Sequence, residues 1–255
     1  MSPRATNLRG MVLDLLFPKV CAACGRGPWP FCPGCRDALI PIKCPMCARC
    51  GAPVSVGVAT CEHCPPPEVD CARSAFVFEG PLRKAIHRLK FAGDRSVAAA
   101  LGSAMAAVLD GEPDAITWVP LSRGRLAERG YDQARALARA VSRQTGVPAQ
   151  RLLVRSRDLP PQALRGAEER RSALADAFSA SRRPPARILL VDDVMTTGAT
   201  AAECARALKH AGASDVEVLT AGRALRKVWG EQGGRVLSSS GLRFGSVVAR
   251  GEVPR

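Results

Sequence analysis

Two neighbouring carboxylates, Asp192 and Asp193, stand between an aliphatic run and a cluster of small hydroxyl residues. Residues 188–191 are wholly aliphatic, which is typical of a strand buried on both faces. We expect this strand to end at the acid pair, where two carboxylates can accept hydrogen bonds from adjacent ribose hydroxyls. Residues 196–200 (Thr-Thr-Gly-Ala-Thr) then offer N–H groups and hydroxyls at a predicted helix start, where phosphate is favoured. This order suits a sugar phosphate better than it suits an ordinary strand, polar turn and helix.

The cysteines form a second group with the spacing of metal ligands. Ten of the eleven lie in residues 21–71, and four Cys-x-x-Cys pairs are present. Two intervening residues let the backbone turn both thiolates of a pair toward one ion. We expect two structural Zn²⁺ sites, the first formed by Cys21, Cys24, Cys32 and Cys35 and the second by Cys47, Cys50, Cys61 and Cys64. Crossed pairing, Cys44 in place of Cys47, and His63 as a ligand stay open, and disulfides are the main alternative.

Charge is spread unevenly along the chain. The formal net charge is +14, and residues 121–170 alone contain eleven arginines against five acids. Such a cluster can serve a pyrophosphate or a nucleic-acid backbone, and its plainer interpretation is a solvated basic surface. The chain has neither a run of 18 apolar residues nor a secretory pattern, so we expect a cytoplasmic protein without membrane insertion.

Strand and helix signals alternate over residues 71–225. Strands are expected at 74–78, 115–119, 188–191 and 215–220, and helices at 81–91, 96–110, 126–145 and 199–213. This alternation predicts a mostly parallel sheet with helices on both faces. Ligands of such sheets bind at the carboxyl ends of the strands, where the acid pair is expected. Residues 155–172 read as a mobile loop that could close over a ligand, and the glycine- and serine-rich residues 226–255 as a flexible tail.

Several motifs in a fixed order resemble the ComF family. They are the four cysteine pairs, Leu89-Lys90-Phe91-Ala92-Gly93, the segment 119–133, and Val-Asp-Asp-Val-Met-Thr-Thr-Gly-Ala-Thr at 191–200. The resemblance implies an α/β fold of the type I phosphoribosyltransferase kind, a mostly parallel sheet with flanking helices, at residues 71–225. It also implies a small N-terminal double zinc-ribbon module at residues 1–70. One departure is Asp132, where the family usually has asparagine.

The resemblance also implies which residues would hold phosphoribosyl pyrophosphate (PRPP) with Mg²⁺. Asp192 and Asp193 would hold the ribose, and Arg123 and Arg125 would stabilise the leaving pyrophosphate, so these four are the catalytic candidates. The other candidate binding residues are Lys90, Ser122, Arg129, Gln133, Val194, Met195, Thr196, Thr197, Gly198, Ala199 and Thr200. For Lys90 the alternative is a cation that only balances the negative end of its helix.

Three functions are compatible with these features. The first is phosphoribosyl binding with possible transfer and pyrophosphate release, although no residue identifies the acceptor. The second, implied by the resemblance, is a non-catalytic accessory role in DNA uptake, with single-stranded DNA and a helicase-like protein as partners. An aromatic content of 4% opposes this role, because single-strand binders usually stack bases on aromatic rings. The third is a regulator that senses PRPP.

Overall fold

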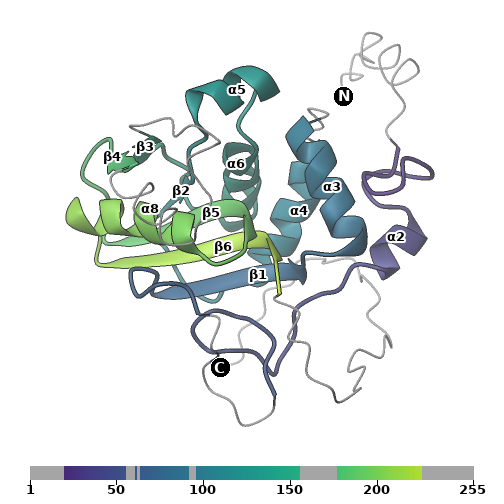
Figure 1. The fold of residues 1–255 in the computed structure, drawn as a ribbon, viewed down its shortest axis with the longest axis horizontal. Coiled ribbons are helices and arrows are strands. Elements are labelled where there is room, and N and C mark those ends of the chain that lie inside the picture. Colours follow the sequence, from purple (N-terminus) through teal and green to yellow (C-terminus); the bar gives the residue numbers. More distant parts are fainter. Residues whose placement is uncertain (1–19, 56–60, 62–63, 92–95, 156–176, 226–255) are drawn as a thin grey trace, which may run out of the picture. The chain divides into compact units, whose positions relative to one another are not determined.

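A four-stranded parallel sheet forms the framework of the molecule (Figure 1). The computed structural model describes residues 20–55, 61, 64–91, 96–155 and 177–225. The strands lie in the order β1 (Cys71–Val77), β6 (Asp215–Arg223), β5 (Arg187–Met195) and β2 (Ala115–Trp118). A small antiparallel sheet pairs β3 (Leu153–Arg155) with β4 (Phe178–Ala180). The predicted mostly parallel sheet is therefore confirmed.

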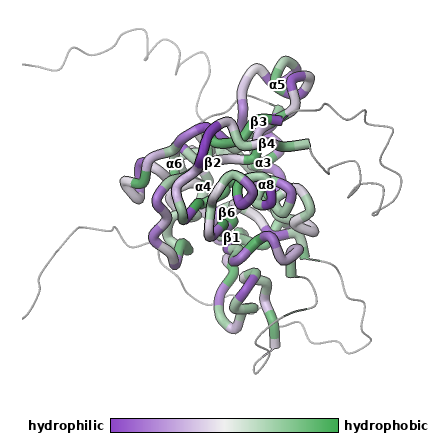
Figure 2. The backbone as a smooth tube through the Cα atoms, turned by 90° about the vertical axis from the view of Figure 1, so that its left-hand side faces the viewer, coloured by the Kyte–Doolittle hydropathy of each residue, from purple (hydrophilic) through white to green (hydrophobic). Residues whose placement is uncertain are grey.

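Helices cover both faces of this sheet, as the sequence predicted. Leu189 and Val191 of β5 pack into one core, and Ile188 and Leu190 pack into the other, because successive strand residues face opposite sides. The first core includes residues of α3 (Gly80–Phe91), α4 (Ser96–Ala106) and α6 (Gln133–Thr145), and the second includes residues of α8 (Ala199–His210). Figure 2 shows α4 and α6 on one side of β6 and α8 on the other side.

The predicted single helix over 126–145 is wrong, because two short helices occupy this stretch. Helix α5 (Arg123–Arg129) begins after Ser122, whose hydroxyl accepts a hydrogen bond from the Arg125 N–H at 3.3 Å. It ends at Gly130, whose φ of 71° suits glycine and breaks the helix. Helix α6 then begins after Asp132, whose Oδ1 accepts from the Arg135 N–H at 3.0 Å. An asparagine at 132 could cap α6 equally well, so this departure leaves the helix start intact.

Strand β5 does not end at the acid pair as predicted. It continues to Met195, because Asp192, Val194 and Met195 stay in register with β6. Asp192 and Asp193 therefore lie within the last part of β5, where pairing with β6 fixes their backbone. Smaller differences are that β6 extends to Arg223, α4 ends at Ala106 and α8 ends at His210.

Both edges of the parallel sheet are hydrogen bonded to neighbouring segments. On the β1 side, the N–H groups of Ala72 and Val77 donate to the carbonyls of Arg49 and Ile40, each at 2.8 Å. On the β2 side, the Ile116 N–H donates to the Pro148 carbonyl at 2.9 Å. The cysteine-containing segment thus covers the edge of β1. In the same segment α2 (Pro33–Asp37) forms a single short helix.

Some predictions fall on residues outside the described ranges. These are residues 156–172 of the loop predicted at 155–172, His63 and the tail 226–255. Within the ranges that are described, no helix has the length and apolar character needed to span a membrane.

Candidate functional site

A buried ion pair fixes one of the two acids at the carboxyl edge of the sheet. Asp193 is 5% exposed, and its Oδ2 lies 2.5 Å from the Nζ of Lys90. Lys90 belongs to the last turn of α3, the helix that follows β1. The pair therefore joins two segments that are far apart in the sequence. This contact favours a place for Lys90 in the site over the interpretation of a cation that only balances its helix end.

The second acid, Asp192, lies where its surroundings do not favour a charged carboxylate. Its Oδ1 accepts a hydrogen bond from the Asp193 N–H at 2.8 Å. Burial and the neighbouring charge of Asp193 nevertheless raise the pKa of Asp192 well above its usual range, and Lys90 offsets this only in part. A cation or a pair of hydroxyl donors at this position would relieve that unfavourable charge.

The turn after β5 leads directly into a helix start. Thr196 and Thr197 are exposed, and Gly198 is the buried N-cap of α8 with a φ of 78°. The Thr197 hydroxyl accepts from the Ala199 N–H at 3.4 Å. Glycine has no side chain to accept from the first-turn N–H groups, and a helix start with such groups and nearby hydroxyls is suited to an anion.

Three other residues predicted to belong to the phosphate loop lie in the flanking strand or helix instead. Val194 and Met195 belong to β5, and their side chains pack into the two cores on opposite faces of the sheet. A ligand would therefore meet these two through their backbone. Thr200 lies in the first turn of α8 and is half-buried.

The arginines predicted for pyrophosphate lie on α5. Arg123 and Arg125 are both exposed, and the hydroxyl of Ser122 is engaged in capping the helix. Among the described residues, neither arginine forms a hydrogen bond or ion pair with the acid pair. The helix follows β2, so both arginines still lie after the carboxyl end of a strand in the parallel sheet.

Two other candidate binding residues, Arg129 and Gln133, lie near Phe91. The guanidinium of Arg129 lies 5.0 Å from the centre of the Phe91 ring, and Arg129 donates to Oε1 of Gln133 at 3.1 Å. Phe91 follows Lys90 directly and is 55% exposed, whereas Gln133 is 3% exposed. Contacts therefore link Arg129 and Gln133 to the end of α3, next to the Lys90–Asp193 pair.

The eight cysteines gather into the two predicted tetrads. Cys21, Cys24, Cys32 and Cys35 form the first tetrad, and Cys47, Cys50, Cys61 and Cys64 form the second, with all ligand atoms of a tetrad within 4.8 Å of one another. Zinc–sulfur bonds of about 2.3 Å would place tetrahedral sulfurs about 3.8 Å apart. The sulfurs of Cys24 and Cys32 lie 3.7 Å apart in the first tetrad, and neighbouring sulfurs lie 3.3 to 3.9 Å apart in the second. Both tetrads are therefore compatible with zinc-ribbon sites.

The same backbone pattern surrounds the first cysteine of each tetrad. Burial opposes ionisation of Cys21, but backbone N–H groups of Cys24 and Cys32 lower its pKa to about 6. Burial opposes ionisation of Cys47 as well, but the backbone N–H groups of Cys50 and Cys61 lower its pKa to about 6. Preformed N–H donors that favour a thiolate are what a metal-binding turn requires.

Three residues next to the second tetrad had no signal in the sequence. They are Arg49, Pro65 and Arg223, and each connects the second tetrad to the α/β domain, Arg49 through its carbonyl, which accepts from the Ala72 N–H of β1. Spacing within the cysteine pairs cannot reveal them, because their partners are distant along the chain.

Comparisons with known proteins agree with this architecture. Residues 12–65 match the family model described as the double zinc ribbon domain. The chain is 32% identical over 221 residues to DNA utilization protein YhgH of Escherichia coli O157:H7, a match that covers 80% of this chain and 96% of that protein. It is 31% identical over 211 residues to competence protein F of Haemophilus influenzae, covering 76% and 90% of the two chains.

These features define a parallel α/β protein preceded by two cysteine tetrads of the zinc-ribbon kind. The chain belongs to the ComF family of competence and DNA utilization proteins. A solved structure of glutamine PRPP amidotransferase from B. subtilis aligns with 49% of this chain and 26% of its own, at 25% identity and a TM-score of 0.36.

Proposed function

We propose that this protein binds a phosphoribosyl ligand, specifically PRPP with Mg²⁺, at the carboxyl edge of its parallel sheet. The observation that supports this most is the succession of the acid pair, the exposed Thr196–Thr197 turn and the start of α8. Carboxylates for ribose hydroxyls and N–H groups for a phosphate thus lie on one short stretch of chain.

Each chemical group of the ligand has a counterpart in this arrangement. Asp192 and Asp193 accept hydrogen bonds from the ribose hydroxyls, while Lys90 holds the Asp193 carboxylate in place. The first N–H groups of α8 bind the 5′-phosphate. Carboxylate oxygens are ligands that Mg²⁺ accepts, and a cation beside Asp192 would offset the burial and the Asp193 charge that raise the pKa of Asp192. Bound Mg²⁺ would neutralise pyrophosphate oxygens.

The proposal extends to phosphoribosyl transfer with release of pyrophosphate. Arg123 and Arg125 can each hold phosphate oxygens through two N–H groups, which suits a leaving pyrophosphate. Their exposure on α5 leaves both guanidinium groups accessible to a ligand. The acceptor is unassigned, because no described side chain is placed to select it.

The proposal includes one structural Zn²⁺ in each tetrad. Four thiolates with sulfur separations near the tetrahedral value suit Zn²⁺ better than they suit a hard cation. The ions would stabilise a segment whose own apolar core, formed by Cys47, Cys50 and Ala52, is small.

Titration calorimetry with PRPP and Mg²⁺ tests the ligand assignment. The wild-type protein is expected to bind with saturation at one site per chain, and the Asp192→Asn/Asp193→Asn variant to lose binding. Asp114→Asn is the matched control, because Asp114 pairs with Arg187 at the opposite end of β5. Equal binding by the double variant and the wild-type protein would refute the site. Release of pyrophosphate in the same samples, where water is the only acceptor at C1, would show that the site cleaves the bond between C1 and the pyrophosphate.

A second candidate function is binding of single-stranded DNA, and one feature of α6 favours it. Arg135, Arg139 and Arg143 are all exposed and recur every four residues, so they form a basic row along one side of the helix. The names of the relatives refer to DNA utilization and competence. Replacing the three arginines by glutamate would lower both the affinity for an oligonucleotide and its dependence on salt. Unchanged affinity would dismiss this surface.

A further inference from the structure

The second tetrad lies directly against the turn that leads into α8. Pro65 follows the ligand Cys64 and is buried, and a Cβ built on Gly198 would lie only 2.6 Å from the Pro65 Cβ. Because real Cβ atoms do not approach so closely, the two backbones meet here without room for a side chain. Pro65, the residue after the candidate metal ligand Cys64, thus packs against the turn Thr196–Gly198 at Gly198.

A buried arginine makes a second connection at the same place. Arg223, the last residue of β6, is 2% exposed, and its Nη2 lies 3.8 Å from the sulfur of Cys50. Arg223 pairs in the sheet with Met195, the residue immediately before the turn. A Cys₄ site with Zn²⁺ carries a net charge of about −2, so a buried guanidinium beside it is electrostatically favoured. The metal site and the end of β5 therefore share one neighbour.

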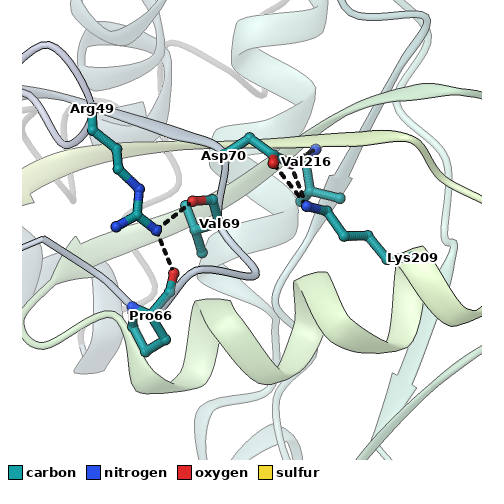
Figure 3. A network of polar contacts seen from close by, with 6 residues as sticks. All are labelled: Arg49, Pro66, Val69, Asp70, Lys209 and Val216. Carbon is teal, nitrogen blue, oxygen red and sulfur yellow. Dashed lines mark hydrogen bonds and ion pairs between the residues drawn. The ribbon is translucent and has the colours of Figure 1, made fainter.

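A third connection runs through the segment between the tetrad and β1 (Figure 3). Arg49 lies between Cys47 and Cys50, and its Nη2 donates to the carbonyls of Pro66 and Val69 at 2.8 and 3.0 Å. These two bonds fix the segment that begins at Pro65 to the cysteine turn itself.

The far end of the same segment is fixed to the α/β domain. Asp70 accepts from Nζ of Lys209 in α8 and from the Val216 N–H of β6, the latter at 2.8 Å (Figure 3). Burial opposes its charge, but these hydrogen bonds lower the pKa of Asp70. The segment 65–70 is thus held at one end by the second tetrad and at the other by α8.

We infer that metal in the second tetrad positions the phosphate-binding turn, with Pro65 and Arg223 as positioning residues. Metal binding holds the Cys64–Pro65 bond against Gly198 and keeps the α8 N–H groups directed at one point. Loss of the metal to a chelator would release Pro65 and loosen the turn. The affinity of the site would then depend on the zinc supply. Only the effect on ligand affinity rests on the proposed phosphoribosyl function, since the order of the turn is a property of the protein alone.

The test compares Pro65→Ala with Pro33→Ala. Both prolines follow a ligand cysteine, Cys64 and Cys32, but Pro33 is exposed and belongs to the first tetrad. Native mass spectrometry is expected to show two zinc ions per chain in wild type and in both variants. Hydrogen exchange of amides 196–201, measured without ligand, is expected to rise at least tenfold in Pro65→Ala and to stay at the wild-type rate in Pro33→Ala.

Arg223→Met supplies a second and independent reading. Its zinc is expected to be lost to a chelator at least tenfold faster from one of the two sites, with exchange of amides 196–201 rising as that site empties. Titration with ribose 5-phosphate then reports affinity, which is expected to fall about tenfold in both Pro65→Ala and metal-depleted protein. Unchanged amide exchange in Pro65→Ala and in metal-depleted protein would overturn the inference. Faster exchange with no ribose 5-phosphate binding even in wild type would leave the inference standing and refute the proposed ligand instead.

Discussion

The two cysteine tetrads share the two-residue spacing within each cysteine pair and the same backbone pattern around their first cysteine, yet they meet the α/β domain in different ways. The first contacts α3, where Arg88 donates to the carbonyl of Cys21 at 3.1 Å and Ala22 joins the core. The second contacts the end of β6 and the turn before α8 through Arg223 and Pro65. Two cysteine tetrads of the same kind thus support different parts of one candidate site, the part near Lys90 and the part proposed to hold the phosphate.

The largest expected effect is loss of the second tetrad through Cys47→Ser/Cys50→Ser. This change removes the metal and also the sulfur beside the buried Arg223, and removing one partner of a buried charge costs about 3 kcal/mol or more. Thermal unfolding, with zinc content measured in parallel, is expected to show a greater loss of stability than in the matched Cys21→Ser/Cys24→Ser variant. Equal losses would mean that the two tetrads are equivalent supports.

The next effect concerns the α3 side of the site. Lys90→Met leaves the Asp193 carboxylate buried without its ammonium partner, which is expected to destabilise the protein by about 2–3 kcal/mol. Adding Asp193→Asn should restore most of that loss, since the buried charge is then gone. Denaturant unfolding of both single variants and the double variant gives the coupling energy. Additive effects would show that the ion pair does not hold α3 to β5.

A smaller effect, of opposite sign, is expected for Asp192→Asn. The pKa of Asp192 is raised in the fold, so its protonated form stabilises the protein below the unfolded pKa of about 4. This stabilisation is lost as the pH rises through the raised value, and asparagine removes the dependence. Calorimetry should find equal Tm values for the wild-type protein and the variant at about pH 4. At neutral pH the Tm of the variant should be about 2–4 °C higher than that of the wild-type protein. A lower Tm at neutral pH would contradict this assignment.

The smallest effect is expected for Arg88→Ala, which removes the hydrogen bond from α3 to the first tetrad. One such bond contributes about 1 kcal/mol. Tm is expected to fall slightly, while hydrogen exchange of amides 196–201 stays at the wild-type rate, because the turn is supported by the second tetrad. Faster exchange there would show that the supports on the two sides of the site are not separate.

Local patterns predicted the parts of the molecule that are built locally. The cysteine pairing followed from two-residue spacing, and the parallel sheet followed from alternating strand and helix signals. The break at Gly130 was missed because residues 123–129 and 133–145 both favour a helix, and the glycine and the N-cap residue Asp132 between them were outweighed. The continuation of β5 past Asp192 was missed because charged residues rarely lie in a strand, and here pairing with β6 overrides that preference.

The candidate site could be predicted only to the level of residues near a strand end. The contact of Lys90 with Asp193 joins two segments separated by a hundred positions, and nothing in either segment specifies the other. Pro65 and Arg223 are still less visible, because proline and arginine are common and their effect depends on what lies opposite them. Contacts between residues so far apart in the sequence arise only when the chain folds, so local motifs do not reveal them.

The hydrogen bonds along the outer side of β1 have a consequence for solubility. An uncovered edge strand presents free N–H and C=O groups that pair readily with another chain. Here two N–H groups of β1 donate to the carbonyls of Arg49 and Ile40 in the cysteine-containing segment. A fragment beginning at Cys71 would keep its strands but offer β1 as an open template, so it would form sheets that run from one molecule into the next.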